Sequence, residues 1–503
     1  MQFGTGVPGY LDLMKHKSSI LVALILFGLH ASVCDAKEYR IDTQASFDAL
    51  RTAAFRPGDT ILFKKGISLK GMFAPTGNGT EAAPIRIGTF GEGALPRIDA
   101  QGKCKAGLLL RNPSYWEVTG LEITNTDGSD KDQGDLFGIF VVAKEKEGTY
   151  RHVYITDCHV HDVNGKVAGK RRGGIHVHVT GLKETIFHDL RILRNRVERV
   201  GGVGIGNTSS CGRVEFLKDS TVNHHLWTNV HVADNYVGET GRNAIIARTS
   251  KDAVYERNVL AHSSRYDTGH SIFCFHTDAI KIQYNEAYGN VGEEGKDRGG
   301  FDADYNCVNT HIQYNYSHDN MWFCGIMKRR NRNVVIRYNV SQNDREGIYF
   351  YGFESQKEAR GIHIYNNTHF VRKGLKVQVI AEDRTPLNSR FENNVFYFED
   401  RGTWGKRSKG INTVFRNNLY HNVSPHASDS NAMVGAPKFL RPGVAGTGID
   451  LRTLGALRGY GLQIGSPCID AGLRIKSCGG RDLLGNQVLP GKADIGAIEW
   501  LRN

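Results

Sequence analysis

A short phrase of alternating apolar and polar residues that ends in asparagine recurs through the middle of this 503-residue chain. From Asn235 to Asn417 the copies follow one another at steps of 23, 27, 30, 24, 27, 27 and 24 residues. Period-two alternation rich in β-branched and aromatic residues predicts that each phrase is a strand. Repetition at such a period indicates stacked units rather than one compact core. The copies end at Asn195, Asn235, Asn258, Asn285, Asn315, Asn339, Asn366, Asn393 and Asn417, with weaker copies at Asn125 and Asp157.

The length of one repeat decides between the architectures that such strands can build. A step in the twenties is too short for a β-α-β unit of about 30 residues or more, and a β-propeller blade takes roughly 40. No amphipathic helical pattern separates the phrases, so a helical or leucine-rich solenoid is not expected. One coil of three short strands and three turns fits the step. We therefore predict an all-β chain folded as a parallel β-helix of about ten or more coils.

The recurring asparagines and the two ends of the repeat region fit this prediction. Asparagine tolerates left-handed backbone angles, and its amide can bond to backbone groups, so stacked coils would align these side chains in a ladder. The sequence SFDALRTAA at Ser46–Ala54 predicts a short N-terminal helix that caps the first coil, since exposed strand edges need covers. We place the cap and entry coils at 37–115 and the β-helix with its active cleft at 116–425. A C-terminal capping segment is expected at 426–503.

The N-terminus has the pattern of a secretory signal peptide, which we assign to residues 1–36. Lys15 and Lys17 precede the apolar run Ile20–Leu29, which is shorter than the roughly 20 residues that a membrane span requires. Ala36 ends a small-residue stretch that could be cleaved. The chain is therefore predicted to be secreted or periplasmic, with no membrane span after the signal is removed.

Charge and cysteine content narrow the class of partner. The net charge of +12 favours an anionic polysaccharide outside the cell, although it could equally serve general solubility. We find no nucleic-acid recognition motif, and nucleic acid is not an expected partner. Nine cysteines include Cys34 in the predicted signal, and none of the others forms a CxxC pair, which argues against a structural zinc site. We expect a monomer without a metal centre of its own.

Segments near both ends of the mature chain resemble a known superfamily. The stretches PGDTILFKKG at Pro57–Gly66 and APIRIGTFGEGALPRIDA at Ala83–Ala100 resemble the entry coils of the pectin-lyase-like β-helix superfamily. SPCIDAG at Ser466–Gly472 and DIGAIEW at Asp494–Trp500 resemble a closing segment of such exported proteins. The resemblance covers nearly the whole mature chain and implies a right-handed parallel β-helix in a secreted carbohydrate-active enzyme. It does not specify the reaction, because this fold hosts lyases, hydrolases, epimerases and adhesins.

A second strand precedes each asparagine phrase, and its outward residues predict a groove that binds sugar. Side chains alternate between the two faces of a strand, and coils stack about 4.8 Å apart, so outward residues form one continuous surface. The inward column is predicted to be Ile175, Ile205, Ile245, Ile272, Phe301, Ile326 and Ile348. Substrate binding is assigned to the outward residues His176, His178, Arg248, Phe275, Arg329, Tyr349 and Tyr351. The alternative is a stacking ladder that only stabilises the fold.

Asp302 and Asp304 are the predicted catalytic pair of a glycoside hydrolase. At positions i and i+2 of one strand their Cβ atoms should lie about 6.6 Å apart, within the roughly 6.5–9.5 Å that separates the carboxyl groups of inverting glycosidases. One would act as general acid, with a pKa raised by the neighbouring charge, and the other as general base. The arrangement resembles the aspartate cluster of polygalacturonase-like hydrolases. Glu346 or Asp344 could add a third carboxylate, and His276 is a further candidate for proton transfer.

Two alternatives to hydrolysis remain open at this point. A calcium-dependent lyase would use Asp302 and Asp304 to hold the ion, and cations to neutralise a uronate. That reading resembles the pectate-lyase members of the superfamily. The cations would be Arg248, Lys328, Arg329 and Arg330. The other alternative is a surface protein that binds a polysaccharide without turning it over.

Overall fold

The computed structural model describes residues 36–144, 147–211, 225–292, 297–327, 329–352, 359–381, 385–448, 455–489, 491 and 493–501. All of them belong to one compact unit, Ala36–Asn503. The predicted signal segment, apart from Ala36, lies outside the described residues, as does Lys328. No helix in the described part of the chain is long and apolar enough to cross a membrane.

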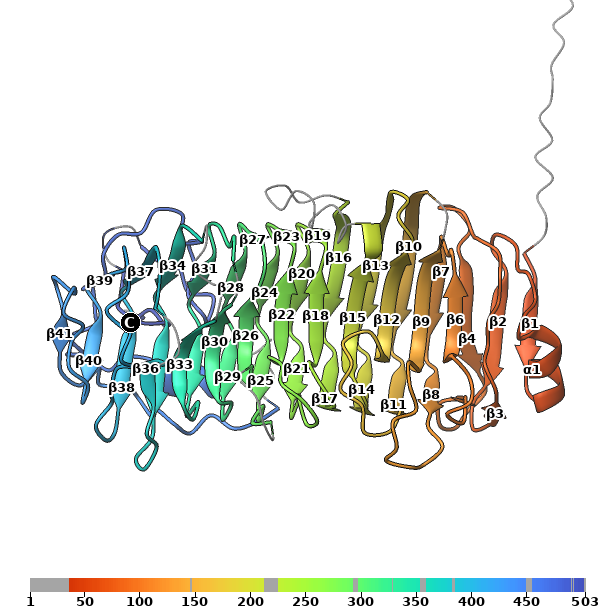
Figure 1. Ribbon diagram of the computed structural model, residues 1–503, viewed down its shortest axis with the longest axis horizontal. Coiled ribbons are helices and arrows are strands. Elements are labelled where there is room, and N and C mark those ends of the chain that lie inside the picture. The colour runs from red at the N-terminus through yellow and green to blue at the C-terminus, as the bar shows by residue number, and fades with distance from the viewer. Residues whose placement is uncertain are drawn as a thin grey trace, which may run out of the picture. The chain divides into compact units, whose positions relative to one another are not determined.

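Three parallel sheets run the length of this unit, so the described residues form the predicted parallel β-helix (Figure 1). Sheet 1 contains β1 (Glu38–Ile41), β2 (Thr60–Lys64), β4 (Ile85–Phe90), β7 (Trp116–Thr119), β10 (Gly148–Thr156), β13 (Thr185–Leu193), β16 (Trp227–Ala233), β19 (Ser250–Lys251), β20 (Val254–Glu256), β23 (Thr277–Asp278), β24 (Lys281–Gln283), β27 (Cys307–Val308), β28 (His311–Gln313), β31 (Val335–Arg337), β34 (Ile362–Tyr365), β37 (Ser389–Glu392) and β39 (Val414–Arg416). Sheet 2 contains β3 (Ser68–Lys70), β5 (Arg97–Asp99), β8 (Glu122–Asn125), β11 (His159–Val163), β14 (Arg196–Val200), β17 (Tyr236–Thr240), β21 (Val259–Ala261), β25 (Glu286–Tyr288), β29 (Tyr316–His318), β32 (Val340–Gln342), β35 (Thr368–Val371), β38 (Val395–Phe398), β40 (Leu419–His421) and β41 (Met433–Val434). Sheet 3 contains β6 (Ala106–Arg111), β9 (Phe137–Lys144), β12 (Gly173–Thr180), β15 (Val203–Ser209), β18 (Ile245–Arg248), β22 (Ile272–Phe275), β26 (Gly299–Ala303), β30 (Trp322–Ile326), β33 (Gly347–Tyr351) and β36 (Gln378–Ile380).

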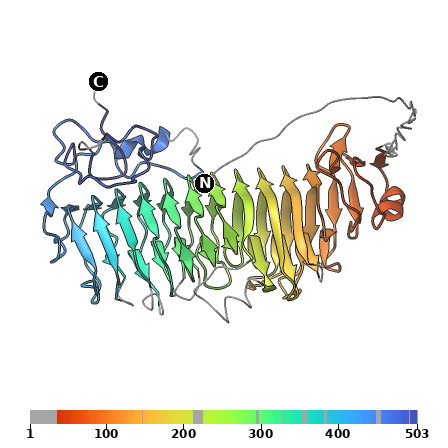
Figure 2. The ribbon, with the colours of Figure 1, turned by 90° about the horizontal axis from the view of Figure 1, so that it is seen from above.

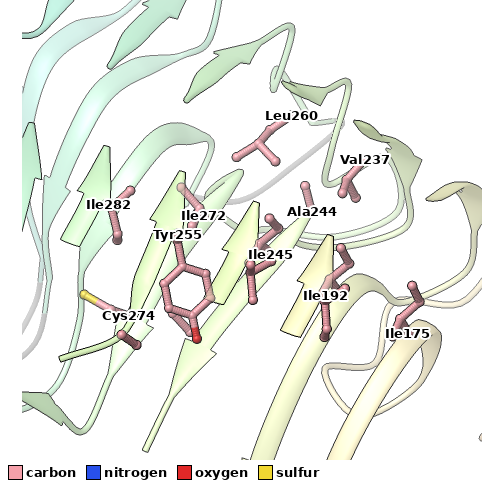
Figure 3. Packing of buried hydrophobic residues seen from close by; sticks show 14 of the residues in the cluster. Ile175, Ile192, Val237, Ala244, Ile245, Tyr255, Leu260, Ile272, Cys274 and Ile282 are labelled. Carbon is pink, nitrogen blue, oxygen red and sulfur yellow. The ribbon is translucent and has the colours of Figure 1, made fainter. Parts of the chain in front are cut away.

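The interior of the coils is a continuous apolar core, and most of the predicted inward column lies in it. Ile175, Ile205, Ile245, Ile272 and Phe301 occupy matching positions of successive sheet 3 strands and are almost fully buried. Figure 3 shows three of them together with residues that other sheets contribute to the same cluster. Stacking like side chains in this way buries apolar surface in every coil, which is the main stabilising contribution to such a fold.

The prediction that Tyr349 and Tyr351 face outward is wrong, because β33 aligns with the inward column at Tyr349 rather than at Ile348, a shift of one residue. Cys324, rather than Ile326, lies beside Phe301. Tyr349 pairs with Cys324 and so points inward, as does Tyr351. Their hydroxyls bond inside the core, that of Tyr349 with Nε2 of His369 (3.0 Å) and that of Tyr351 with Oγ of Ser389 (2.9 Å). Both tyrosines are therefore core residues that a substrate does not reach.

The asparagine ladder forms, with its last members one residue later than predicted. Asn315 is typical: its amide nitrogen donates to Oδ1 of Asn339 (3.0 Å) and to the carbonyl of Ile282 (2.9 Å). The buried members are Asn195, Asn235, Asn258, Asn285, Asn315, Asn339, Asn367, Asn394 and Asn418. The preceding residues carry the left-handed backbone angle instead, including Asn366, Asn393 and Asn417. The two roles that we assigned to one asparagine thus belong to two consecutive positions.

Both ends of the chain pack onto the coils. The predicted N-terminal helix is α1 (Gln44–Leu50), which begins after a capping box of Thr43 and Ser46 and buries Phe47 against the first coils. After β41 the chain returns along sheet 2, including the short 3-10 helix η1 (Gly455–Tyr460) (Figure 2). There the hydroxyl of Tyr460 donates to Oε1 of Gln342 (2.6 Å). Most of the segment predicted as a C-terminal cap therefore covers the side of earlier coils.

The eight cysteines that follow residue 36 all carry free thiols, six of them buried.

Candidate functional site

Three aspartates line one cavity of about 250 Å³ on the outer face of sheet 3. Asp302 lies on β26 and Asp304 follows directly after that strand, so alternation directs both side chains to the same face. Asp297 precedes β26, and its backbone amide donates to Oγ1 of Thr268 (2.7 Å). Asp297 and Asp304 are partly exposed, whereas Asp302 is 3% exposed. The structure thus brings together the predicted pair and a third carboxylate that the strand alignment did not reveal.

Asp302 occupies a pocket that two neighbouring coils leave open for it. The backbone amide of Met327 donates to its Oδ1 (3.3 Å). A Cβ atom on Gly325 would lie 2.9 Å from that oxygen, so glycine is needed on the adjacent strand. Burial raises the pKa of Asp302 well above its usual value, and the charges of Asp304 and Asp297 raise it further. Asp302 therefore holds its proton at pH values where an ordinary aspartate has lost it.

His270 lies against Asp302 and is neutral at physiological pH. Its Nδ1 is 3.7 Å from Oδ2 of Asp302, and burial lowers its pKa to about 4. Its Nε2 has no hydrogen-bond partner among the described residues. Added Cβ atoms on Gly299 and Gly325 would lie 2.7 Å and 2.8 Å from the ring, so the imidazole is held tightly between two coils. This packing fixes one wall of the aspartate cavity.

Two cations share the cavity with the aspartates. Lys170 reaches it from the loop before β12, and its Nζ lies 4.8 Å from the ring centre of Phe273. Burial lowers the pKa of Lys170, an effect that Arg242 adds to and that Asp304 opposes. Arg242 forms an ion pair with Asp267. Among the described residues, no three His, Cys, Asp or Glu side chains come together as a metal-binding group.

A second cavity, of about 440 Å³, adjoins the first through Lys170, which lines both. It lies at the ends of the sheet 3 strands, and its described lining includes four cationic side chains and no carboxylate. Phe275 and Tyr305 form an edge-to-face aromatic pair with ring centres 5.6 Å apart in its wall. The cationic residues are Lys170, Arg171, Arg248 and Arg329.

The predicted binding residues divide between these cavities and the protein interior. The cationic cavity is lined by four of the predicted residues, Arg248, Phe275, Arg329 and His276. We expected His276 near Asp302, but it does not line the aspartate cavity. The prediction that His176 and His178 bind substrate is wrong. His176 and His178 are on the outer face of β12 but are buried against the rings of β9, and burial lowers the pKa of His176 to about 4. They lie beneath the surface, where a sugar does not reach them.

The two acidic residues near β33 do not join the aspartate cavity. Asp344 is buried and accepts bonds from the hydroxyls of Ser317 (2.9 Å) and Ser341 (2.8 Å) and from the amide of Asn320 (3.0 Å). That environment assigns it to the packing of sheet 2. Glu346 is half exposed and lies 3.5 Å from a guanidinium nitrogen of Arg298. Glu346 does not line the cavity that the three aspartates share, so its catalytic role stays a prediction.

A buried aromatic cluster on the C-terminal side of Asp302 escaped the sequence analysis. The rings of Trp322 and Phe350 stack with centres 4.7 Å apart, and the guanidinium of Arg298 lies 6.0 Å from the Trp322 ring centre. Both rings lie on the outer face of sheet 3, where each is almost fully buried in a small cluster with Met327 and Ala381. The signal was present as WFCGI at Trp322–Ile326, but aligning the strand on Ile326 concealed it.

The described residues form the right-handed parallel β-helix that the sequence resemblance implied. No protein-family model matches the chain. The chain is similar to a lacto-N-biosidase of Bifidobacterium longum subsp. longum, with 27% identity over 88% of this chain. It spans only 34% of that relative's length.

Solved structures give the same picture of the fold. A GH136 lacto-N-biosidase from Eubacterium ramulus superimposes with a TM-score of 0.59 at 19% identity, covering 77% of this chain and 68% of that one. XylC in complex with xylose gives a TM-score of 0.51 at 10% identity, covering 93% of this chain and 99% of that one. At these identities the likeness establishes a shared fold.

Proposed function

We propose that this chain is a glycoside hydrolase that cleaves a polysaccharide in the aspartate cavity of sheet 3. The observation that carries the proposal is the convergence of Asp297, Asp302 and Asp304 on one cavity. Glycoside hydrolysis needs a protonated carboxyl group and a carboxylate on opposite sides of the scissile bond. Similarity to a lacto-N-biosidase, a glycosidase by name, supports this reaction class.

The exposure of the three carboxyl groups suggests how they divide the work. Asp304 is partly exposed and interacts electrostatically with Lys170, so we assign it the role of base or nucleophile. The proton donor is then Asp302, whose pKa is raised, or Asp297, which is more accessible. A substrate with a good leaving group needs no acid assistance. The variant of the true donor, Asp302→Asn or Asp297→Asn, will therefore recover activity on such a substrate.

The substrate that we propose is an acidic polysaccharide outside the cytoplasm. The net charge of +12 and the cationic cavity beside the aspartates both favour an anionic chain. Export would rest on the predicted signal segment.

A polysaccharide lyase is the second candidate, because Arg248 and Arg329 line the cavity that adjoins the aspartate cavity and could neutralise a uronate. The two reactions leave different products: hydrolysis gives reducing ends alone, whereas elimination also gives an unsaturated sugar that absorbs ultraviolet light. We would incubate the mature protein with acidic and neutral polysaccharides, with calcium or with a chelator, and follow both signals. Reducing ends without absorbance, in chelator as in calcium, are expected. Absorbance rising with the reducing ends would identify a lyase, and neither signal on any substrate would favour a binding protein.

A further inference from the structure

The cationic cavity has a charge composition that neutral sugars do not require. Among its described lining residues are one lysine and three arginines, against no carboxylate. Arginine forms paired, charge-assisted hydrogen bonds with carboxylate and sulfate oxygens.

The position of this cavity relates it to the bond that is cleaved. Lys170 lines both cavities, and the charge of Asp304 partly opposes the fall that burial causes in the pKa of the Lys170 ammonium. Arg248 lies 5.6 Å from the ring centre of Phe273, a residue of the aspartate cavity. One sugar chain lying along sheet 3 would therefore have one residue beside the aspartates and the next among the cations.

The wall of the cavity is also shaped for a sugar ring. Phe275 and Tyr305 present aromatic edges and faces, and the guanidinium of Arg248 lies 5.8 Å from the ring centre of Phe275. The side chain of Asn207 accepts a bond from the backbone amide of Arg248 (2.7 Å), which fixes the arginine at the end of β18. Aromatic groups and arginines held in place by the backbone are what recognition of a charged sugar needs.

Resting on the proposed hydrolase, we propose that this cavity is a subsite for the acidic group, carboxylate or sulfate, of the sugar residue adjacent to the scissile bond. Lys170, Arg248 and Arg329 would bind the acidic group, and Phe275 with Tyr305 would contact the ring. The subsite makes the enzyme select a chain by the charge of the sugar neighbouring the cleavage point.

Affinity electrophoresis in three gels tests the subsite independently of turnover. The gels contain dextran, carboxymethyl dextran or dextran sulfate, which share one neutral backbone and differ in the charged group. We expect about tenfold tighter retention by at least one charged polymer, since a charge-assisted bond contributes about 1.4 kcal/mol or more, which is a factor of ten. The charged polymer that retains the protein identifies the group as carboxylate, sulfate or both.

A pair of double variants with the same net charge separates the subsite from general polyelectrolyte binding. Arg248→Gln with Arg329→Gln should reduce retention about tenfold. Arg372→Gln with Arg401→Gln removes two exposed charges that line neither cavity, and should change it less than about twofold. Equal losses in the two variants would overturn the proposal.

A measurement on the unaltered protein guards against variants that fail to fold. Calorimetric titration should detect glucuronate or a sulfated glucose but not glucose at the same concentration, and equal responses to all three would overturn the subsite. Charge discrimination without any hydrolysis would leave the subsite standing and remove the proposed function. Hydrolysis at the same rate whether the neighbouring sugar is charged or neutral would support the proposed function and overturn the subsite.

Discussion

At the scale of single residues, burial raises the pKa of two aspartates, one inside the proposed site and one far from it in sequence and role. Asp302 is buried at the edge of a cavity, where a retained proton is useful to acid catalysis. Asp344 is buried among hydroxyls and an amide, and burial raises its pKa to about 7. The same desolvation thus serves the proposed chemistry at one position and makes stability depend on pH at the other.

Asp344→Asn tests this effect away from the site. Because the pKa of Asp344 is higher in the folded chain than its usual 3.8, the protonated group stabilises the fold at low pH. That contribution is lost as the pH rises through about 7, at a cost on the order of 4 kcal/mol over the whole range. The neutral variant should therefore gain stability relative to wild type between pH 5 and pH 8. Urea midpoints at both pH values measure it, and a constant difference between the two proteins would contradict the assignment.

Residue-level prediction from the sequence succeeded where a site residue belonged to the repeating strand pattern. Asp302, Asp304, Arg248 and Phe275 follow strand alternation and reach the outer face of sheet 3 as expected. Asp297, Lys170, Arg242 and His270 come from loops, whose paths no periodic signal describes. His176 and His178 were placed on the correct face, but the sequence does not reveal that neighbouring rings bury them.

At the scale of elements, the asparagine ladder links consecutive coils through buried amides. Asn315 accepts from the amide group of Asn285 and donates to Asn339. Asn315→Ala would leave the buried backbone amide of Asn285 without its acceptor, Oδ1 of Asn315, at about 1–3 kcal/mol. We expect a clear fall in the urea midpoint. Asn431→Ala, at an exposed position, is the control and should leave the midpoint nearly unchanged; equal effects would show that the ladder adds little.

The strand register marks the limit of element-level prediction. The repeat predicts that strands exist and stack, because each coil must bury its own apolar face. It does not fix which apolar residue of a run points inward, since a shift of one position reverses every side chain. In β33 the interior takes Tyr349 beside Cys324 of β30, a large and a small residue that fill the space together, and this shift of one position puts Phe350 on the outer face.

At the scale of the whole described unit, the returning C-terminal segment completes a second apolar core over sheet 2. Leu457 of η1 is fully buried there among residues of β29, β32 and β38. Leu457→Ala should cost about 2–5 kcal/mol by leaving a cavity. Leu440→Ala, at a half-exposed position of the same segment, should cost far less. Thermal unfolding of both variants measures this, and equal shifts would mean that the segment is only loosely attached.

The most direct test of the central claim compares three aspartate variants with one control in the release of reducing ends. Asp252→Asn is a matched control, because Asp252 is exposed, lines neither cavity and has a positive φ that asparagine tolerates. We predict that Asp304→Asn lowers the rate by about a thousandfold or more, which corresponds to loss of transition-state stabilisation of about 4 kcal/mol. Asp302→Asn and Asp297→Asn should also lower it, while Asp252→Asn keeps the wild-type rate. Full activity in a folded Asp304→Asn protein would contradict the account and place the active centre elsewhere on the molecule.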